Sequence, residues 1–421
     1  MLEQRIAAAD TYDVCVVGLG YIGLPTAAVV ARSGARVIGI DVSQHVVDTV
    51  ARGDIHIEEA DLDTLVRDVV LLGRLTTATA PAPADVFVIA VPTPFGPGHA
   101  PDISYVLNAT RAIAPVLARG NTVILESTSP VGTTEQIRDL LAQLRPDLSM
   151  PDDTRTAPDI AIAYCPERVL PGRIIVELVS NERSIGGITP VCAERACGFY
   201  RRFVEGECTV TDARTAEMVK LVENTSRDVA IAFANELSIV CDRMALTVWD
   251  VSALANRHPR VNILQPGPGG GGHCIAVDPW FIVHAAPDET PLIRTAREVN
   301  DGKVDHVVAR VSELLGNHPA ARAALLGLAF KPDIDDLRES PAVKVAQRLV
   351  HRHGGRIDLV EPYVDTLPAA LAGDAELVSL DTALDRADIL IVLVDHTVFK
   401  GVPADRRSGK LIYDTRGMWR D

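Results

Sequence analysis

The chain has 421 residues, more than one hydrophobic core usually spans, so its length predicts two or three domains. Hydrophobic residues make up 47% and charged residues 23% of the chain, and no apolar run approaches the roughly 18 residues of a membrane helix. These values predict a soluble, folded protein that does not enter a membrane. Lysine and arginine number 41 against 56 acidic residues, and no basic stripe stands out, so nucleic acid is not expected as a partner.

The cysteines are odd in number and scattered along the chain, at positions 15, 165, 192, 197, 208, 241 and 274. They have neither the spacing of metal ligands nor the density of a secreted disulfide framework. We therefore expect reduced thiols, no metal site and a cytoplasmic location. Residues 1–13 contain no apolar stretch and lead directly into a strand, which predicts neither a signal peptide nor an anchor.

Residues 14–42 have the pattern of a strand, a Gly-x-Gly-x-x-Gly turn, a helix and a second strand. Gly18, Gly20 and Gly23 let the backbone turn tightly, approach a pyrophosphate and present a helix N-terminus to its charge. Asp41 ends the second strand, where a carboxylate can accept both ribose hydroxyls and would repel a 2′-phosphate. The pattern predicts NAD rather than NADP as cofactor. A glycine-rich turn followed by an N-capping or solvent-facing aspartate is the alternative.

The C-terminal part repeats this alternation, with the strand patterns AALLGLAF, RIDLVEP, ILIVLVD and KLIYDT and a helix over residues 340–353. Residues 211–244 place apolar side chains at helical spacing without an internal Gly or Pro. They predict one helix of about 45 Å that offers a dimerisation face, with two shorter, kinked helices as the alternative. The predicted fold class is therefore α/β, with two Rossmann-like doubly wound parallel-sheet domains joined by a long central helix.

Three polar residues follow predicted strands of the first sheet. Thr93 and Thr128 lie in VIAVPTP and VILESTSPVG, where the carboxyl ends of strands in such sheets contact ligands. Isolated threonines are more often turn or cap residues. Glu167 follows the apolar strand DIAIAY and is a candidate general base, although a lone glutamate is more often a surface charge.

Cys274 follows the run PGPGGGG at residues 266–272, and Asp278 comes four residues later. A ligand can approach a cysteine on such a loop closely, and nearby backbone N–H groups could lower the pKa of its thiol. Inert packing is the alternative that cysteine statistics favour. Lys220 and Asn224 are spaced i, i+4 on the predicted long helix, so both could stabilise one developing negative charge. A solvated polar face is the alternative.

The motifs GLGYIGLP, VPTPF, ESTSPVGTTE, YCPERVLPG, TAEMVKLVEN, GGHCIAVDPW and GLAFKPDIDDLRES, in this order, resemble the UDP-glucose/GDP-mannose dehydrogenase family over nearly the whole chain. The resemblance implies four-electron oxidation of the C6 hydroxyl of a UDP-sugar to a carboxylate, using two NAD and one water. It also implies the domain plan, in which residues 1–210 bind NAD, 211–305 form a central helical domain with the catalytic loop, and 306–421 bind the UDP-sugar.

The substrate that the resemblance implies is a UDP-N-acetylhexosamine, in the first place UDP-N-acetyl-D-mannosamine, whose uronic acid is a precursor of bacterial surface polysaccharides. UDP-N-acetylglucosamine or another UDP-sugar is an alternative. A single-step two-electron dehydrogenase and a non-catalytic nucleotide-sugar-binding protein are further alternatives. We expect a homo-oligomer, at least a dimer formed through the central helix.

The resemblance also implies roles for single residues. Cys274 matches the nucleophile, which forms a thiohemiacetal and then a thioester, and Glu167 matches a glutamate that helps hydrolysis. The residues expected around the reacting carbon are Lys220, Asn224, Thr128 and Asp278. The residues expected near NAD are Gly18, Gly20, Tyr21, Ile22, Gly23, Asp41, Thr93, Thr128 and Arg338. The residues expected near the nucleotide sugar are Arg168, Val169, Lys220, Asn224, Arg227, His258, Arg260, Gly271, Lys331 and Arg416.

Three positions depart from the pattern of the family. Pro171 stands where UDP-glucose dehydrogenases typically carry a second glutamate, which argues against a glucose-specific site. Gly270 stands where the most similar branch commonly has a bulkier aliphatic residue, and we expect this change to loosen the loop before Cys274. Arg416 takes the place of a lysine and preserves the charge.

Overall fold

A computed structural model describes residues 11–57, 59–152, 157–170, 172–272 and 274–420. The chain divides into two compact units, residues 1–222 and 223–421, and we describe each unit by itself. Within the described ranges, no helix combines the length and the apolar character needed to span a lipid bilayer.

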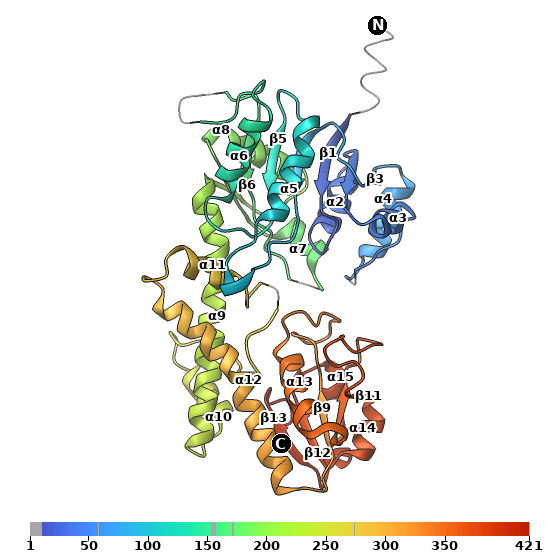
Figure 1. The fold of residues 1–421 in the computed structure, drawn as a ribbon, viewed down its shortest axis with the longest axis vertical. Helices are drawn as coiled ribbons and strands as arrows, with labels where there is room; N and C mark the ends of the chain where they lie inside the picture. Colours follow the sequence, from blue (N-terminus) through green and yellow to red (C-terminus); the bar gives the residue numbers. More distant parts are fainter. Residues whose placement is uncertain (1–10, 58, 153–156, 171, 273, 421) are drawn as a thin grey trace. The chain divides into compact units, whose positions relative to one another are not determined.

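The first unit is built on an eight-stranded sheet of order β3-β2-β1-β4-β5-β6-β7-β8 (Figure 1). All neighbouring strands are parallel except β6 and β7, which are antiparallel. The order of the first six strands is that of a dinucleotide-binding sheet, with its switch point between β1 and β4. The strands are β1 (Tyr12–Val17), β2 (Val37–Ile40), β3 (Leu75–Ala78), β4 (Ala84–Ile89), β5 (Thr122–Leu125), β6 (Ala161–Tyr164), β7 (Arg183–Gly187) and β8 (Cys208–Asp212).

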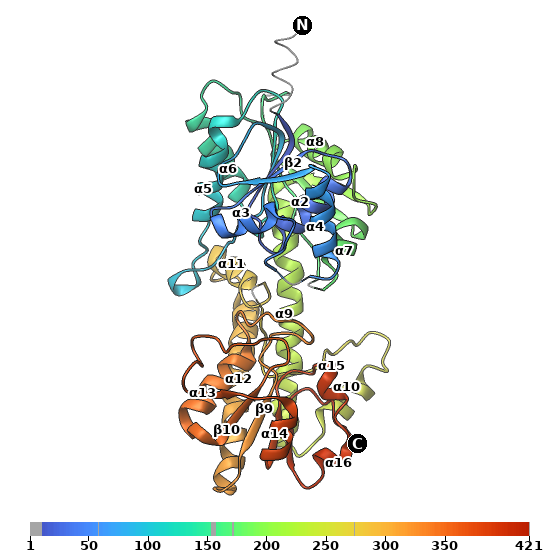
Figure 2. The same cartoon turned by 90° about the vertical axis from the view of Figure 1, so that its right-hand side faces the viewer.

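Helices cover both faces of this sheet, so its central strands are continuous apolar runs rather than alternating ones. One core packs α2, α4, α7 and α8 against the sheet, and the other packs α5 and α6 against the opposite face (Figure 2). The helices are α2 (Gly23–Arg32), α3 (Gln44–Ala51), α4 (Leu62–Leu71), η1 (Pro97–His99), α5 (Ser104–Ile113), η2 (Ala114–Val116), α6 (Thr133–Leu144), α7 (Ile174–Ser180) and α8 (Pro190–Tyr200).

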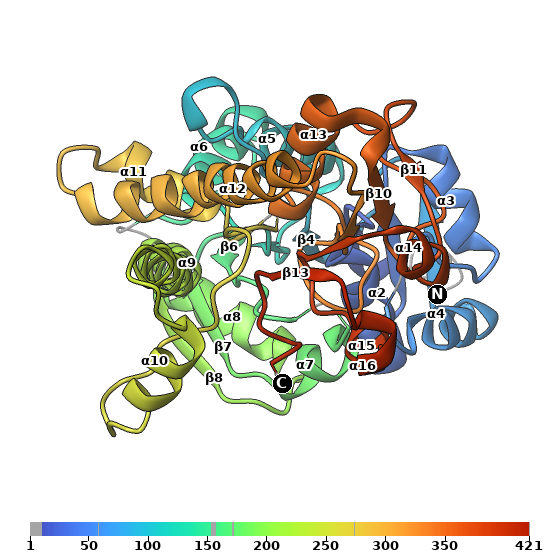
Figure 3. The ribbon, with the colours of Figure 1, turned by 90° about the horizontal axis from the view of Figure 1, so that it is seen from below.

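The helix α9 (Ala213–Arg243) is a single element of 31 residues. Figure 3 shows it end-on, with its turns superimposed. Without an internal Gly or Pro, its hydrogen-bond ladder is uninterrupted over about 45 Å. The prediction of one long helix is confirmed, and the kinked alternative is wrong.

The second unit contains a five-stranded parallel sheet of order β11-β10-β9-β12-β13. Its cores pack α12 and α13 on one face and α14 and α15 on the other. The predicted fold class is confirmed, with the antiparallel pairing of β6 and β7 as a departure. The strands are β9 (Ala323–Leu326), β10 (Ile357–Val360), β11 (Glu376–Leu377), β12 (Ile389–Val392) and β13 (Leu411–Asp414). The helices are α10 (Val248–Ala255), α11 (Asp278–Ala285), α12 (Pro291–Asn317), α13 (Pro341–His353), η3 (Gly354–Arg356), α14 (Leu380–Arg386), α15 (Thr397–Lys400) and α16 (Ala404–Arg407).

A buried polar cluster lies where β5 and β6 end in the first unit. Glu126, directly after β5, accepts hydrogen bonds from Tyr200 Oη at 2.7 Å and Thr26 Oγ1 at 3.3 Å. Glu167, after β6, forms an ion pair with Arg183 at 2.7 Å. Burial, reinforced by the charge of Glu167, raises the pKa of Glu126 to about 7. A single guanidinium therefore faces two carboxyl groups, one of which retains its proton in the folded protein below about pH 7.

This raised pKa predicts how stability depends on pH. Between about pH 4.5 and 7, Glu126 binds a proton in the folded state but not in the unfolded state, so its contribution to the free energy of unfolding falls as the pH rises. We expect Glu126→Gln to reduce the stability lost between pH 5 and pH 8 by on the order of 2 kcal/mol, measured by urea denaturation. The control is Glu135→Gln, which changes a carboxylate of the same unit that is 32% exposed. An unchanged pH dependence in Glu126→Gln would show that the buried carboxyl carries no raised pKa.

Candidate active site

The glycine turn after β1 has the crowding and the open space that a pyrophosphate loop needs. Gly18 has a φ of +95°, and a Cβ there would lie 2.5 Å from the carbonyl oxygen of Ala90. A Cβ on Gly23 would lie 1.8 Å from the carbonyl oxygen of Gly18. A Cβ on Gly20 would meet nothing within 4 Å. Packing therefore requires the first and third glycines, while the middle glycine leaves the backbone open to a ligand.

Asp41 lies directly after β2 and braces this turn. Its Oδ2 accepts a hydrogen bond from the backbone N–H of Leu19 at 3.0 Å, and its Oδ1 accepts one from the N–H of Ser43 at 2.9 Å. Each oxygen has further acceptor capacity, and the residue is partly exposed. The carboxylate is therefore placed to accept ribose hydroxyls and to repel a 2′-phosphate, which fits NAD. Tyr21 and Ile22 lie in the same turn, directly before α2.

The loops after β4 and β5 meet at the same edge of the sheet. Thr93 Oγ1 donates a hydrogen bond to the carbonyl oxygen of Thr128 at 2.5 Å, and Ser127 Oγ donates one to the carbonyl oxygen of Val91 at 2.7 Å. Because β1, β4 and β5 are neighbours, these loops and the glycine turn share one carboxyl edge. The structure thus brings Thr93 and Thr128 together, and the Thr93 hydroxyl also stabilises the loop.

Glu167 is buried, so its interpretation as a surface charge is wrong. Its Oε2 accepts a hydrogen bond from Arg183 at 2.7 Å, and its Oε1 accepts one from the backbone N–H of Arg168 at 2.7 Å. Val169 packs against the core of the first unit. Pro171 lies outside the described residues. A role for Glu167 as a base stays a prediction.

Sequence reasoning missed Glu217, a fully buried residue on α9. Its Oε2 accepts a hydrogen bond from the N–H of Gly132 at 2.6 Å, and its Oε1 accepts bonds from the N–H and Oγ1 of Thr134 at 2.8 and 2.6 Å. These bonds satisfy the N-terminus of α6 and hold the loop that contains Thr128. Lys220 lies one helical turn further along α9, so this helix both fixes a loop of the first unit and carries a predicted catalytic residue.

In the second unit, Cys274 begins a turn that leads into α11. Its carbonyl oxygen accepts hydrogen bonds from the N–H groups of Val277 at 3.0 Å and Asp278 at 2.9 Å. The Oδ2 of Asp278 in turn accepts a hydrogen bond from Nδ2 of Asn224, on α9, at 2.5 Å. Asp278 thus contacts two predicted residues, Asn224 through its side chain and Cys274 through its backbone. Lys220 and Asn224 are each only 9% exposed, so the solvated-face alternative is wrong for both.

Cys274 differs from the other cysteines in its exposure. It is partly exposed, whereas the remaining six of the seven are buried. Burial raises the pKa values of Cys15 and Cys165 to about 12, so these two thiols stay protonated. Inert packing, which cysteine statistics favour, therefore describes the buried cysteines. Cys274, the accessible cysteine, is the residue predicted as nucleophile.

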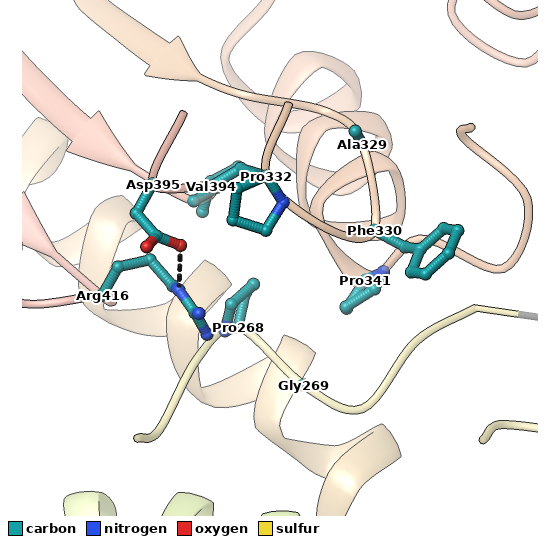
Figure 4. A pocket seen from close by; sticks show the side chains of 10 residues that line it. Pro268, Gly269, Ala329, Phe330, Pro332, Pro341, Val394, Asp395 and Arg416 are labelled. Carbon is teal, nitrogen blue, oxygen red and sulfur yellow. Dashed lines mark hydrogen bonds and ion pairs between the residues drawn. The ribbon is translucent and has the colours of Figure 1, made fainter. Parts of the chain in front are cut away.

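A pocket lies between the residue 266–272 loop and the edge of the second sheet (Figure 4). Arg416 crosses it, donating from Nε to Oδ1 of Asp395 at 2.8 Å and from Nη1 to the carbonyl oxygen of Pro266 at 3.2 Å. Apolar walls beside a guanidinium suit a ligand with a flat ring and an anionic group. Lys331 is the next residue after Phe330, in the loop that follows β9. The lining residues are Pro268, Gly269, Ala329, Phe330, Pro332, Pro341, Leu393, Val394, Asp395 and Arg416.

The remaining predicted ligands occupy more exposed positions. Arg227 is exposed on α9, and His258 and Arg260 are exposed after α10, where the N–H of Arg260 donates to Nδ1 of His258 at 3.3 Å. Arg338 forms a bidentate pair with Asp336 at 2.9 and 2.6 Å. Their contacts with cofactor or sugar stay predictions.

The glycine turn, Asp41 and the order of the first six strands define an NAD-binding dehydrogenase fold. The UDP-glucose/GDP-mannose dehydrogenase family matches the chain with its NAD binding domain over residues 12–204, its central domain over 214–302 and its UDP binding domain over 324–421. The chain belongs to this family and is an NAD-dependent nucleotide-sugar dehydrogenase.

Individual relatives are similar over almost their whole length. The NDP-N-acetyl-D-galactosaminuronic acid dehydrogenase of Ralstonia nicotianae is 57% identical, over 99% of this chain and 98% of the relative. The UDP-N-acetyl-D-mannosamine dehydrogenase of Escherichia coli K12 is 54% identical, over 97% and 99%. Among solved structures, a UDP-D-ManNAc dehydrogenase from Pyrococcus horikoshii has a TM-score of 0.87 and 38% identity, with 97% of this chain and 96% of that chain covered. The UDP-N-acetyl-mannosamine dehydrogenase of Staphylococcus aureus has a TM-score of 0.85 and 40% identity, with the same coverage.

The glycine turn yields a matched pair of substitutions. Gly20→Ala adds a methyl group in open space, so we expect a wild-type melting temperature but NAD binding about tenfold weaker, because the methyl group occupies the ligand's approach. Gly23→Ala forces a clash with Gly18 and should lower stability by about 2 kcal/mol. Calorimetric NAD titration and thermal unfolding measure both effects. Wild-type NAD affinity in Gly20→Ala would contradict the placement of the cofactor at this turn.

Proposed function

We propose that the protein oxidises the C6 hydroxyl of UDP-N-acetyl-D-mannosamine to the carboxylate of UDP-N-acetyl-D-mannosaminuronate. The observation that carries this proposal is that Asp278 links Asn224, by a side-chain hydrogen bond, to the turn that begins at the accessible Cys274. Relatives named for this sugar are 54–56% identical over nearly the whole chain, which supports the choice of substrate. We keep the expected division of labour, with NAD bound by residues 1–210, the catalytic loop in 211–305 and the UDP-sugar bound by 306–421.

Bound NAD serves as the acceptor of a hydride in each of two oxidations. The first oxidation converts the alcohol to an aldehyde with loss of a proton. The Cys274 thiolate then adds to the aldehyde carbon, forming a thiohemiacetal whose oxyanion takes up a proton or is held by hydrogen bonds. Loss of the second hydride, together with any proton that the oxyanion had taken up, leaves a thioester. Attack by water breaks the carbon–sulfur bond, releases the carboxylate and a proton, and regenerates the thiol.

The charged intermediates explain the neighbours of Cys274. The thiohemiacetal and the hydrolysis intermediate each carry negative charge on oxygen, which preorganised donors stabilise in a site with little water. One N–H of the Asn224 amide is fixed on Asp278, which leaves the second N–H to donate to such an oxyanion. Lys220, one helical turn away, supplies an ammonium group. Glu167 is the proposed helper of hydrolysis.

A second substrate candidate rests on the relative that is 57% identical and named for an N-acetyl-D-galactosaminuronic acid. The galacto and manno sugars differ in configuration at C2 and C4, away from the oxidised C6. The same cysteine chemistry therefore serves either sugar, and only the pocket around C2 and C4 distinguishes them. UDP-N-acetylglucosamine is a further member of this substrate class.

We also propose a cytoplasmic homo-oligomer, at least a dimer formed through α9, which supplies a uronic acid for cell-envelope polysaccharide. The dimer is supported by an apolar stripe on this helix. Its residues are 40–56% exposed and, at 100° per residue, fall within about 60° of one another around the helix axis. They are Met218, Val222, Phe233 and Val240.

The proposed reaction fixes its stoichiometry. At limiting UDP-N-acetyl-D-mannosamine, end-point absorbance should give two NADH per sugar, because each oxidation reduces one NAD. In a panel with the UDP forms of N-acetylgalactosamine, N-acetylglucosamine and glucose, kcat/KM should be highest for the manno sugar. A ratio of one with accumulating aldehyde would contradict the four-electron reaction, and a higher kcat/KM for the galacto sugar would favour the second candidate.

Removing the thiol tests covalent catalysis. Cys274→Ala should form no carboxylate, since the aldehyde cannot be trapped, but should still bind NAD and UDP-sugar in calorimetric titrations. Cys274→Ser should stall as an ester, visible as an increase in protein mass, because an ester reacts with water more slowly than a thioester. Cys241→Ala, which removes a buried thiol of the same unit, is the control with full activity. Wild-type acid formation by Cys274→Ala would eliminate the covalent mechanism.

A further inference from the structure

A chain of buried amides links the loop before Cys274 to two helices of the second unit. Asn235, on α9, accepts a hydrogen bond at Oδ1 from the N–H of Gly267 at 2.9 Å. Its Nδ2 donates to Oδ1 of Asn300, on α12, at 2.9 Å. The Nδ2 of Asn300 donates to Oδ1 of Asp228 at 2.8 Å, and Arg297 Nη1 donates to the same oxygen at 2.6 Å. A backbone group of the loop is thus the first member of a continuous polar network.

These groups are almost completely removed from solvent, since Asp228, Asn235, Asn300 and Arg297 are each at most 1% exposed. A buried amide that loses one partner leaves an unsatisfied polar group, at a cost of about 1–3 kcal/mol. The side-chain amides of Asn235 and Asn300 therefore each have one orientation, which is set by their hydrogen-bond partners in the network. The network ends on an ion pair, which orients Asn300 as a donor towards Asp228.

The loop itself packs tightly on the same residues. A Cβ on Gly270 would lie 3.0 Å from Cγ and Nδ2 of Asn300, and one on Gly269 would lie 2.9 Å from the carbonyl oxygen of Asn300. On its other side, a Cβ on Gly271 would lie 2.3 Å from Cδ of Pro341. Glycine at position 270 lets the loop rest directly on the amide of Asn300. Our expectation that Gly270 loosens the loop is therefore wrong.

We propose that Asn235 and Asn300 are positioning residues, which hold the glycine loop so that Cys274 traps the aldehyde before it escapes. Neither residue touches the reacting atoms. Asn235 accepts the N–H of Gly267, and Asn300 packs against residues 269–270. Because Cys274 follows this loop in the chain, the position of the loop sets the position of the nucleophile. The inference rests on the proposed covalent role of Cys274.

The test compares Asn235→Ala with Ser238→Ala. Ser238 lies one helical turn further along α9 and also joins this helix to α12, because its Oγ accepts a hydrogen bond from Lys303 Nζ at 2.7 Å. It is 7% exposed, and in the described part of the chain its hydroxyl bonds the carbonyl oxygen of Asn235 and Lys303 rather than the glycine loop. Both variants remove a buried bond between the two helices, but only Asn235→Ala releases the loop.

We expect Asn235→Ala to lower kcat on the order of 10- to 100-fold, with a smaller change in KM for the UDP-sugar, because the nucleophile is misplaced. Aldehyde captured by phenylhydrazine should appear, and the NADH yield per sugar should fall below two. Hydrogen exchange of the peptide covering residues 266–272 should speed up, since the Gly267 N–H loses its acceptor. Ser238→Ala should retain all aldehyde and keep wild-type exchange in this peptide.

Asn235→Asp provides a second variant. It keeps an oxygen acceptor for Gly267 but loses the donor to Asn300, so it should release less aldehyde than Asn235→Ala. The substitutions Gly270→Ala and Asn300→Ala should be non-additive, because the added methyl group fits once the amide is removed.

Wild-type exchange and wild-type aldehyde retention in Asn235→Ala would overturn the proposal. Equal effects of Asn235→Ala and Ser238→Ala would also overturn it, by showing that the network only packs two helices. The exchange measurement does not depend on turnover. Normal acid formation by Cys274→Ala would contradict the covalent mechanism. Hydrogen exchange in Asn235→Ala would still show separately whether Asn235 holds the glycine loop.

Discussion

The hydrogen bond between the Asn224 amide and the Asp278 carboxylate joins the long helix to the turn that presents Cys274, the proposed nucleophile. The rest of the site in the second unit depends on it. Asp278 also donates its backbone N–H to the carbonyl of Cys274, so one residue fixes both the helix and the cysteine. A carboxylate in this place orients the amide and fixes one of its two N–H groups; the other is the donor that we propose for the oxyanion.

Polar side chains hold three loops of this protein in position. Glu217 satisfies the N-terminus of α6, Asp41 braces the glycine turn, and Asn235 holds Gly267. In each case a side chain in or directly after a regular element accepts bonds from the backbone N–H groups of a loop. Such contacts are costly to break in a medium of low dielectric constant, so they specify a single loop conformation. Loops without secondary structure are thereby held in a defined position.

Glycines act in two opposite ways in this chain. At Gly18, Gly23 and Gly271 a side chain would collide with backbone or proline atoms, so glycine permits close packing. At Gly20 the space is empty, so glycine keeps a surface accessible. The run at residues 266–272, which has the composition of a flexible linker, is a packed segment because each of its five glycines lies against another part of the second unit.

The sequence by itself determined the features that depend on neighbours close in the chain. The glycine turn with Asp41, the single long helix, and α13 beginning at Pro341 after its cap Ser340 were all predicted, because each follows from local periodicity, turn chemistry or capping. The ordered motifs also identified Cys274, Asn224 and Asp278 as a group. Their spacing alone did not, since Asn224 and Asp278 are 54 residues apart.

Only the tertiary structure decided which polar residues are buried together. Arg183 pairs with Glu167 from 16 residues away, Asn235 bonds Asn300 across 65 residues, and Glu217 reaches Thr134 across 83. No local pattern distinguishes these residues from solvated ones, because a lone polar side chain has the same appearance in a sequence in either setting. The antiparallel pairing of β6 and β7 was hidden for the same reason. Strand direction depends on the path of the intervening chain, which here contains α7, and the local pattern of β7 does not reveal it.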